Sequence, residues 1–301
     1  MRQGGGTDTD TERIGRAVAL SGAGKWGTVP FSALVPHMSS RALSRARGIC
    51  PDAAGVIVAA FPYFAGYTEG NVSMYARGED YHKVVLQRLG RSCEALEKEF
   101  PGKRFIPLAD ASPLPEKLAA AMAGMGVIGR STLFFCDGFG SFVFLGCILT
   151  DAVPCTDPEQ IRGCAGCLQC VRACPTRALR VVEGRVVFEK ERCVSAVTQR
   201  KGELSAEQEG YVRAGGSAWG CDVCQKACPM NRGLGTDALD EFKAGAGGYI
   251  NSLDLDTLLG MDDAGFFREY SGYAFSWRGR QPLIRNLRIL EGEKASRASE
   301  R

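Results

Sequence analysis

Runs of apolar and alternating residues divide the first half of the chain into strands and helices. Residues 53–61, AAGVIVAAF, are continuously apolar and predict a buried strand, and FIPLA at 105–109 predicts another. Residues 83–100 carry apolar side chains at the i, i+3, i+4 spacing of an amphipathic helix. STLFF at 131–135 and SFVFLGCILT at 141–150 are typical of strands joined by the turn CDGFG. Strands that alternate with helices predict an α/β domain.

Other stretches complete this outline. PLPEKLAAAMA, residues 113–123, predicts a helix that begins after Ser112, with a proline at its first position. GAGKWGT at 22–28 lacks the length and the K-[ST] ending of a phosphate-binding loop, so we interpret it as a flexible connection. From about residue 236 the pattern is mostly helical and ends in the polar tail EGEKASRASER.

Composition suggests more than one domain and a cytosolic protein. The chain has 301 residues, of which 45% are hydrophobic, enough for two cores. The N-terminal residues are polar and contain no apolar signal segment. The longest apolar run, residues 142–149, is far shorter than the ~18 residues that indicate a membrane span. We therefore expect a cytoplasmic protein with no membrane partner, and the net charge of +3 does not by itself predict a nucleic-acid partner.

Two cysteine runs carry the clearest chemistry. The first, GCAGCLQCVRACP at 163–175, has the spacing C-x2-C-x2-C-x3-C-P that bacterial ferredoxins use for iron–sulfur clusters. The second, GCDVCQKACP at 220–229, has C-x2-C-x3-C-P, and Cys193 lies between the two runs. In such sequences the fourth cysteine of a run binds the other cluster. The spacing therefore predicts two [4Fe–4S] clusters.

The same rule predicts how the eight thiolates are shared. One cluster takes the first three cysteines of the first run and the last of the second, and the other takes the remaining four. The predicted sets are Cys164, Cys167, Cys170 and Cys228 for one cluster, and Cys174, Cys193, Cys221 and Cys224 for the other. Structural zinc and disulfides are the alternatives. Zinc sites usually pair two C-x2-C knuckles across a longer spacer, and disulfides need an oxidising compartment.

The remaining side chains exclude several common cofactors. Five cysteines have no ligand spacing and are interpreted as buried thiols: Cys50, Cys93, Cys136, Cys147 and Cys155. No G-x-G-x-x-G follows a strand, so a dinucleotide site is unsupported. The two histidines are too few for a mononuclear metal site built on imidazole. His82, in DYHKVV, is interpreted as a residue near the start of a helix.

From about residue 54 to 290 the chain resembles the epoxyqueuosine reductases, which use cobalamin and iron–sulfur clusters to finish queuosine synthesis on tRNA. The resemblance is carried by YARGEDYHKV, LADASPLPEKLAAAMAGMGVIGRSTLF, GSFVFLGCILTD, both cysteine runs with RCVSAVTQRKG between them, and FFREYSGYAFSWRGRQPLIRNLRIL. It implies an N-terminal α/β domain that binds cobalamin, as in reductive dehalogenases. A bacterial-ferredoxin-like domain with two [4Fe–4S] clusters and a short helical C-terminus would follow. The expected boundaries are 1–155, 156–235 and 236–301.

The resemblance also implies a reaction. Electrons from an external low-potential donor, such as a ferredoxin or flavodoxin, would pass through the clusters to bring cobalt to Co(I). Asp110, in A-D-A-S, matches the family's proton donor for the departing epoxide oxygen, although an ordinary helix-entry aspartate is the alternative. To act as an acid near neutral pH, Asp110 needs a pKa raised by burial in an apolar pocket.

Further positions match the family more weakly. Leu145, Ser195, Asp222 and Val223 are similar to residues that line the corrin, although packing explains Leu145 and Val223 equally well. Gln199 and Lys201 match positions near the tRNA, with a solvated turn as the alternative. A late segment mixes aromatic and basic residues that can contact RNA or pack inward as a terminal helix. These residues are Tyr270, Tyr273, Phe275, Trp277, Arg278, Arg280, Arg285 and Arg288.

Some features depart from the family and leave the substrate open. Val127, Ser131 and Cys147 replace an aromatic residue, an asparagine and a glutamate. The sequence also stops soon after NLRIL, where many members continue into helical repeats that help to hold tRNA. Two other functions therefore stay open. One is a corrinoid-dependent reductase of a small molecule, similar to a dehalogenase, and the other is an electron-transfer protein that reactivates the corrinoid of a partner.

Overall fold

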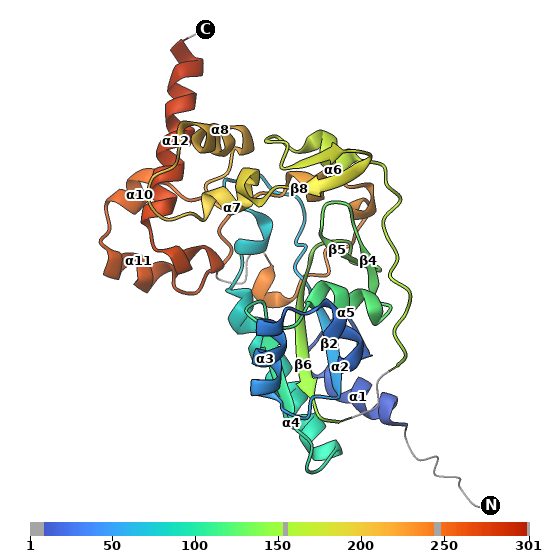
Figure 1. The fold of residues 1–301 in the computed structure, drawn as a ribbon. Helices are drawn as coiled ribbons and strands as arrows, with labels where there is room; N and C mark the ends of the chain where they lie inside the picture. Colours follow the sequence, from blue (N-terminus) through green and yellow to red (C-terminus); the bar gives the residue numbers. More distant parts are fainter. Residues whose placement is uncertain (1–8, 153–155, 244–247, 300–301) are drawn as a thin grey trace, which may run out of the picture.

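A four-stranded antiparallel sheet organises the first half of the chain (Figure 1). The computed structural model describes residues 9–152, 156–243 and 248–299. The strand order is β1–β2–β6–β3, and each neighbouring pair is antiparallel. The four strands are β1 (Lys25–Pro30), β2 (Gly55–Pro62), β3 (Phe105–Ala109) and β6 (Val143–Thr150).

Helices cover both faces of this sheet, which explains why β2 is apolar at every position. Ile57, Ala59 and Phe61 point to the face covered by α1 (Asp10–Ala19) and α4 (Tyr81–Glu99). The alternate residues of β2 point to the other face, where they pack with α2 (Phe31–Leu34), α3 (Ser40–Ile49) and α5 (Glu116–Met122). Successive strand residues face opposite sides, so a strand between two helical layers needs no polar positions.

Gly146 in β6 allows α4 to approach the sheet closely. A Cβ at this position would lie 2.6 Å from Val85 Cγ1 and 2.7 Å from Leu89 Cδ1, both on α4. Any larger side chain would push the helix outward. The N-terminal end of α4, which carries His82, is held against the sheet by the same helix packing.

The second half consists of short elements, three longer helices and a separate apolar core (Figure 1). The core joins residues 72–76 and 218–219 to the C-terminal helices. One hairpin, β4 (Gly126–Ile128) with β5 (Phe134–Cys136), precedes β6 in the first half, and another, β7 (Leu179–Val182) with β8 (Arg185–Phe188), lies in the second. The helices are α6 (Gln169–Ala173), α7 (Val194–Thr198), α8 (Ala206–Gly215), α9 (Val223–Lys226), α10 (Leu255–Leu259), α11 (Asp263–Tyr270) and α12 (Gln281–Ser299). Single 3-10 turns occur at Val35–His37, Met74–Ala76, Lys190–Arg192, Pro229–Asn231, Asp240–Phe242 and Ala274–Arg278.

Most predicted elements of the first half are confirmed, with three corrections. The strand predicted at 131–135 is β5, Phe134–Cys136, because Thr132 takes a left-handed turn conformation with a φ of 65°. The helix predicted from residue 113 begins at Glu116, because Pro115 disfavours helical backbone at the residue before it, and Ser112 instead accepts the Leu114 N–H at 3.2 Å. The flexible connection predicted at 22–28 is wrong, since Lys25–Pro30 is the edge strand β1, whose pairing with β2 sequence periodicity did not reveal. Among the described residues, no helix has the length and apolar character needed to cross a membrane.

Candidate active site and cluster ligands

Asp110 directly follows β3 and contacts a histidine at the start of α4. Its backbone has a φ of 54°, a left-handed conformation that aspartate tolerates better than most residues. Asp110 Oδ2 lies 3.1 Å from His82 Nε2, and His82 Nδ1 lies 2.7 Å from Asp80 Oδ1. Asp80 also caps α4 by accepting the His82 N–H. The helix-start interpretation of His82 is confirmed, while its contact with Asp110 was not predicted.

The environment of Asp110 is the opposite of the apolar pocket expected from the sequence, and that expectation is wrong. Its side chain is 58% exposed. The hydrogen bond from His82 lowers the pKa of Asp110 and outweighs the effect of desolvation, and the Tyr81 hydroxyl lowers it further. The same contact with Asp110, together with Asp80, raises the pKa of His82 to about 9. At neutral pH the two carboxyl groups and the imidazole therefore share one titratable proton, and it lies mainly on the imidazole, which is then an imidazolium.

An aromatic stack holds this group against the sheet. The Tyr81 ring stacks on the His82 ring at 4.0 Å and on Phe144 of β6 at 4.2 Å between centroids. Phe144 in turn stacks on Tyr63 at 4.5 Å. Desolvation raises the pKa of the Tyr81 hydroxyl, so this hydroxyl is a hydrogen-bond donor rather than an anion. The stack fixes the imidazole plane and the direction in which it presents its proton.

The ion pair gives a prediction that needs no cofactor. The His82 imidazole should titrate near pH 9 in an NMR titration of the wild-type protein, and Asp110→Asn should lower its pKa toward the ordinary value of about 6.5. The stabilisation from the pair is complete below about pH 6.5 and is lost as the pH rises through 9. Because the chain has two histidines, His37→Gln identifies the signals. A wild-type His82 midpoint near 6.5 would contradict the pairing.

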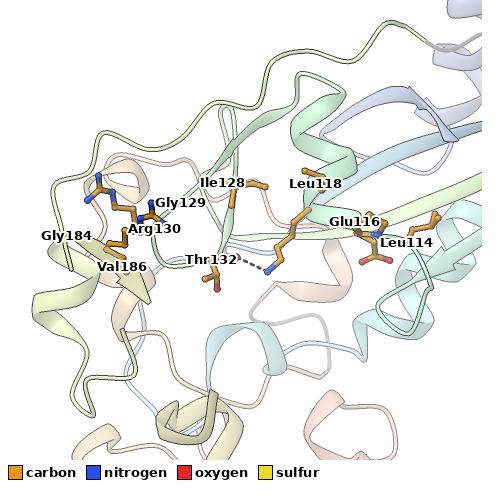
Figure 2. Close-up of a pocket in the computed structure, with 12 residues that line it drawn as sticks. Leu114, Glu116, Leu118, Ile128, Gly129, Arg130, Thr132, Gly184 and Val186 are labelled. Atoms are coloured by element: carbon orange, nitrogen blue, oxygen red, sulfur yellow. Dashed lines mark hydrogen bonds between the residues drawn. The ribbon is translucent and has the colours of Figure 1, made fainter. Parts of the chain in front are cut away.

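Glu116, the first residue of α5, is a half-buried residue whose carboxyl oxygen Oε1 is buried without a hydrogen-bond partner, and no sequence motif singled it out. It lines a cleft of about 780 Å³ together with apolar side chains and three basic residues (Figure 2). Burial raises the pKa of Glu116 to about 7, against opposing hydrogen bonds from Ser112 and from the Asp110 backbone. The raised pKa of Glu116 depends on how α5 packs against the sheet. A sequence motif could not reveal it.

The thiols of the first predicted set lie together. Burial is the main reason that the pKa of Cys228 is raised, and the charges of Cys167 and Cys164 contribute. The pKa of Cys170 is raised in the same way, with contributions from Cys164 and Cys228. All four thiols line one small cavity beside Arg130. The last cysteine of the second run is therefore next to the first three of the first run.

The second set also lies together. Burial raises the pKa of Cys221 to about 11, and the charges of Cys193 and Cys174 contribute. The pKa of Cys224 is raised by burial and then by Cys221, Cys193 and Cys174, with a smaller contribution from Cys170 of the first set. Each set thus presents four sulfurs, the number that a [4Fe–4S] cubane needs. The donor sets fit two clusters.

The other cysteines are packed as ordinary apolar residues. The thiols of Cys50, Cys93, Cys136 and Cys147 are free and buried, which confirms their interpretation. Cys155 lies outside the described residues. Cys147, on β6, is electrostatically coupled to Glu116.

The residues predicted to contact the corrin occupy different surroundings. Leu145 is half-buried in β6 opposite Ala60, and Val223 begins α9. Ser195 lines a cleft of about 560 Å³ whose wall also contains Cys193. The Asp222 carboxylate is buried and engaged, since it accepts hydrogen bonds from the Ser73 hydroxyl and, at 2.9 Å, from the Met74 N–H.

The late aromatic and basic segment packs mostly inward. Tyr270 and Phe275 are buried in the apolar core that joins residues 72–76 and 218–219 to the C-terminal helices. Arg280 pairs with Asp263 at 2.6 Å, and Arg285 donates to backbone carbonyls of residues 200 and 202. These contacts support the alternative of an inward-packing segment. Trp277 and Arg288 are exceptions, because both are exposed, Trp277 to 56%.

Of the two residues predicted to lie near the tRNA, one is held by hydrogen bonds and the other is exposed. Gln199 donates to the Tyr75 hydroxyl at 3.3 Å and to the Ser195 carbonyl at 2.9 Å, whereas Lys201 is exposed. The Arg278 guanidinium lies 3.6 Å from the Trp277 ring centre. Trp277, Arg278 and Gln199 line the same cleft as Ser195.

Two family descriptions match the chain. "Epoxyqueuosine reductase QueG, DUF1730" matches residues 44–111, which include the Asp80, His82 and Asp110 group. "4Fe-4S double cluster binding domain" matches residues 163–231, which include all eight predicted ligands. The prediction of two [4Fe–4S] clusters is confirmed by this match.

Curated relatives support the resemblance predicted from the sequence. An epoxyqueuosine reductase of Lactococcus garvieae is 31% identical over 77% of this chain and 64% of the relative. That of Vibrio cholerae is 35% identical over 73% of this chain and 58% of the relative. The chain thus spans less than two thirds of the length of these relatives. The Aliivibrio fischeri enzyme is 28% identical over 89% of this chain and 74% of its own length.

Solved structures confirm the fold. A selenomethionine-labelled epoxyqueuosine reductase superposes with a TM-score of 0.79 at 25% identity, covering 93% of this chain and 80% of the other. A second epoxyqueuosine reductase, solved with an epoxyqueuosine-modified tRNA-Tyr stem loop, gives 0.78 at 24% identity with the same coverage. The mixed helix and strand class predicted from the sequence is therefore correct.

Proposed function

We propose that this chain, whose sequence and fold resemble those of the epoxyqueuosine reductase family, is a cytoplasmic reductase that converts epoxyqueuosine to queuosine in tRNA. Its relatives carry the name of that reaction, and one solved epoxyqueuosine reductase holds the modified stem loop. One observation carries the proposal. A proton-bearing Asp80–His82–Asp110 chain and two sets of four thiols belong to one fold.

We assign the reaction to residues 1–155, electron transfer to 156–235, and support of both to 236–301. Electrons would enter from a low-potential ferredoxin or flavodoxin at the cluster of Cys164, Cys167, Cys170 and Cys228, since Cys167 is exposed. The second cluster would pass them on, because its ligand Cys193 lines the cleft that also contains Ser195. If electrons entered at the second cluster instead, the cluster that includes the exposed Cys167 would have no role in the transfer.

We place the corrinoid beside the second cluster, because an open cleft there is lined by the predicted ligand Cys193 and by Ser195. A group bound in the Ser195 cleft would contact the segment that holds Cys193. Cobalamin bound there would supply a strongly reducing two-electron centre. Ser195 would offer its hydroxyl to the bound group, whereas Leu145 and Val223 do not line this cleft. Asp222 would act through its backbone, because Ser73 and Met74 already occupy its carboxylate.

The proton for the departing oxygen comes, in this proposal, from the His82–Asp110 pair. Asp80 holds Nδ1, so that Nε2 faces Asp110. Asp110 is exposed, ionised and bonded to a charged imidazole, and it passes on the proton of the pair rather than storing one of its own. A pair that holds one proton across neutral pH replaces the raised pKa expected from the sequence.

The test is anaerobic reconstitution with iron, sulfide and cobalamin, followed by assay on tRNA that carries epoxyqueuosine. We expect queuosine to form. Binding of an epoxyqueuosine anticodon stem loop should weaken as salt increases, since any phosphate contact by Lys201 or Arg278 releases counterions. Trp277→Ala should weaken binding of the stem loop at any salt concentration, because it removes an exposed ring on which a base could stack. The packing around the buried Phe266 should not change. The matched control is Phe267→Ala, an exposed aromatic on α11 away from the Ser195 cleft.

Two results would redirect the assignment. Reduction of a small halide or epoxide without tRNA binding would favour a small-molecule reductase. Rapid reduction of added cobalamin with no substrate turnover, despite full cofactor loading, would favour an electron-transfer protein.

A further inference from the structure

Cys167 is the most accessible of the eight predicted cluster ligands. This residue is exposed, whereas the other seven are partly buried. It lies in the loop of the first cysteine run and lines a small cavity together with Cys164, Cys170 and Cys228. Electron transfer slows steeply with distance. A protein that donates electrons to this set of thiols therefore has to contact the surface around Cys167.

Two arginines bracket this cysteine. The Arg172 guanidinium, on α6, donates to the Cys167 carbonyl at 3.2 Å. The Arg130 guanidinium lies on the Gly166 backbone, where a Cβ would be 3.2 Å from Arg130 Nη2. The Arg130 N–H donates to Cys164 Sγ at 3.4 Å. Both arginines are exposed, and neither forms an ion pair with another described residue. A guanidinium has five N–H groups, so each keeps its charge and free donors for a partner.

The segments around the first thiol set are basic. Residues 160–182, which contain the first cysteine run, include four arginines and no aspartate or glutamate. Residues 223–236, which contain Cys228, include one lysine, one arginine and no acidic residue. In contrast, residues 183–209 around Cys193 have six acidic and five basic residues, so their charges nearly cancel. A cluster with four thiolates is itself an anion. An acidic protein can therefore approach only where the surrounding side chains outweigh that charge, which favours the first set.

Met230 adds an apolar contact to this surface. It lines the same cavity as Cys167 and is 38% exposed. Arginine and methionine are enriched in protein–protein interfaces. Electron-transfer complexes are weak and bury little area, so a small surface suffices. Arg130, Cys167, Arg172 and Met230 together form a surface that we call the Cys167 face.

We propose that the Cys167 face docks an acidic electron-carrier protein that holds a low-potential flavin or iron–sulfur centre. The inference gives the partner of the proposed function a contact surface and a charge, and it rests on that function. The two arginines attract the carrier and hold its reduced centre opposite Cys167. In each encounter the carrier loses one electron and this protein gains one. Two encounters supply the two electrons that removal of an epoxide oxygen consumes.

The first test measures reduction of the clusters without tRNA or cobalamin. The reconstituted protein is mixed anaerobically with an excess of photoreduced flavodoxin of net negative charge, and the loss of cluster absorbance gives the rate. We expect Arg172→Glu and Arg130→Glu each to lower this rate by about 10-fold at low ionic strength, because the surface then repels the carrier. The difference from wild type should disappear at ~1 M salt, which screens surface charge. Arg172→Lys should keep most of the rate.

The matched control is Arg47→Glu, which changes the net charge by the same amount. Arg47 is exposed on α3, which lies well away from α6 in Figure 1. This variant should be reduced at the wild-type rate. Reduction by photoexcited deazaflavin, a small molecule that needs no docking surface, should be equal in all variants. Each variant should also keep about eight irons per chain, which separates slower docking from loss of a cluster.

Three results would overturn the inference. The first is equal rates for Arg172→Glu, Arg130→Glu and wild type at low ionic strength. The second is a wild-type protein that flavodoxin does not reduce although deazaflavin does. The third is normal reduction of both variants by flavodoxin with loss of binding to the epoxyqueuosine stem loop, since the face would then contact RNA. Salt-dependent reduction of a wild-type protein that forms no queuosine would instead count against the proposed function.

Discussion

Asp110→Asn should reduce epoxyqueuosine turnover by about 10²- to 10⁴-fold, the usual contribution of a positioned acid. Asparagine keeps the size and the position after β3, but it cannot relay the proton that His82 holds 3.1 Å away. Electron transfer from the clusters should be unaffected, because no predicted ligand is changed. The measurements are single-turnover queuosine formation and, on the same sample, the rate of cobalamin reduction.

The control for this variant is Asp157→Asn, an exposed aspartate in the segment before the first cysteine run. It should leave both rates unchanged. If Asp110→Asn turns over at the wild-type rate, Asp110 is not the donor. If the fully loaded wild-type protein itself forms no queuosine while cobalamin is still reduced, the electron-transfer function becomes the better explanation.

Loss of one thiol from each set should remove a different cluster. We expect Cys228→Ala and Cys164→Ala each to lower the iron content from about eight to about four per chain, and to leave the same remaining EPR signal. Cys174→Ala and Cys224→Ala should also retain about four irons but leave the other signal. The physical reason is that the thiols of each set, although distant in sequence, lie close enough to affect one another electrostatically.

This comparison decides between shared and separate cysteine runs. If each run held its own cluster, Cys228→Ala would resemble Cys224→Ala rather than Cys164→Ala. Cys93→Ser, a buried thiol on α4, is the control and should keep about eight irons. One tightly bound zinc per chain in place of iron would favour the alternative of a zinc site.

Local patterns predicted individual elements better than their arrangement. FIPLA is strand β3 at the expected boundaries, and the helix expected at 83–100 is α4. The pattern of alternating helices and strands suggested an α/β domain, yet every pair in the main sheet is antiparallel. Apolar periodicity reports which faces are buried, and both directions of pairing bury them equally well. The N-terminal edge strand was missed for a related reason, since the partner of Lys25 in the register is Ala60, 35 residues away.

In the site, too, the sequence indicated where a residue lies but not the pKa that its surroundings give it. Resemblance drew attention to Asp110, but its charge state follows from His82, which approaches from a different element. Glu116 carries no motif, and its raised pKa arises from the packing of α5 over β6. A carboxyl group has the same ordinary pKa at every place in a sequence, and only its neighbours in space change it.

Cluster chemistry could be recognised before any fold was known, because the spacing of cysteines along a short loop limits which sulfurs can reach one cubane. Buried strands and amphipathic helices could be recognised for a similar reason, since each is a repeat over a few residues. Proton chemistry could not. Whether Asp110 or Glu116 holds a proton depends on a histidine, an unpaired oxygen and a helix brought together from separate elements, and electrostatic interactions depend on distance in space rather than along the chain.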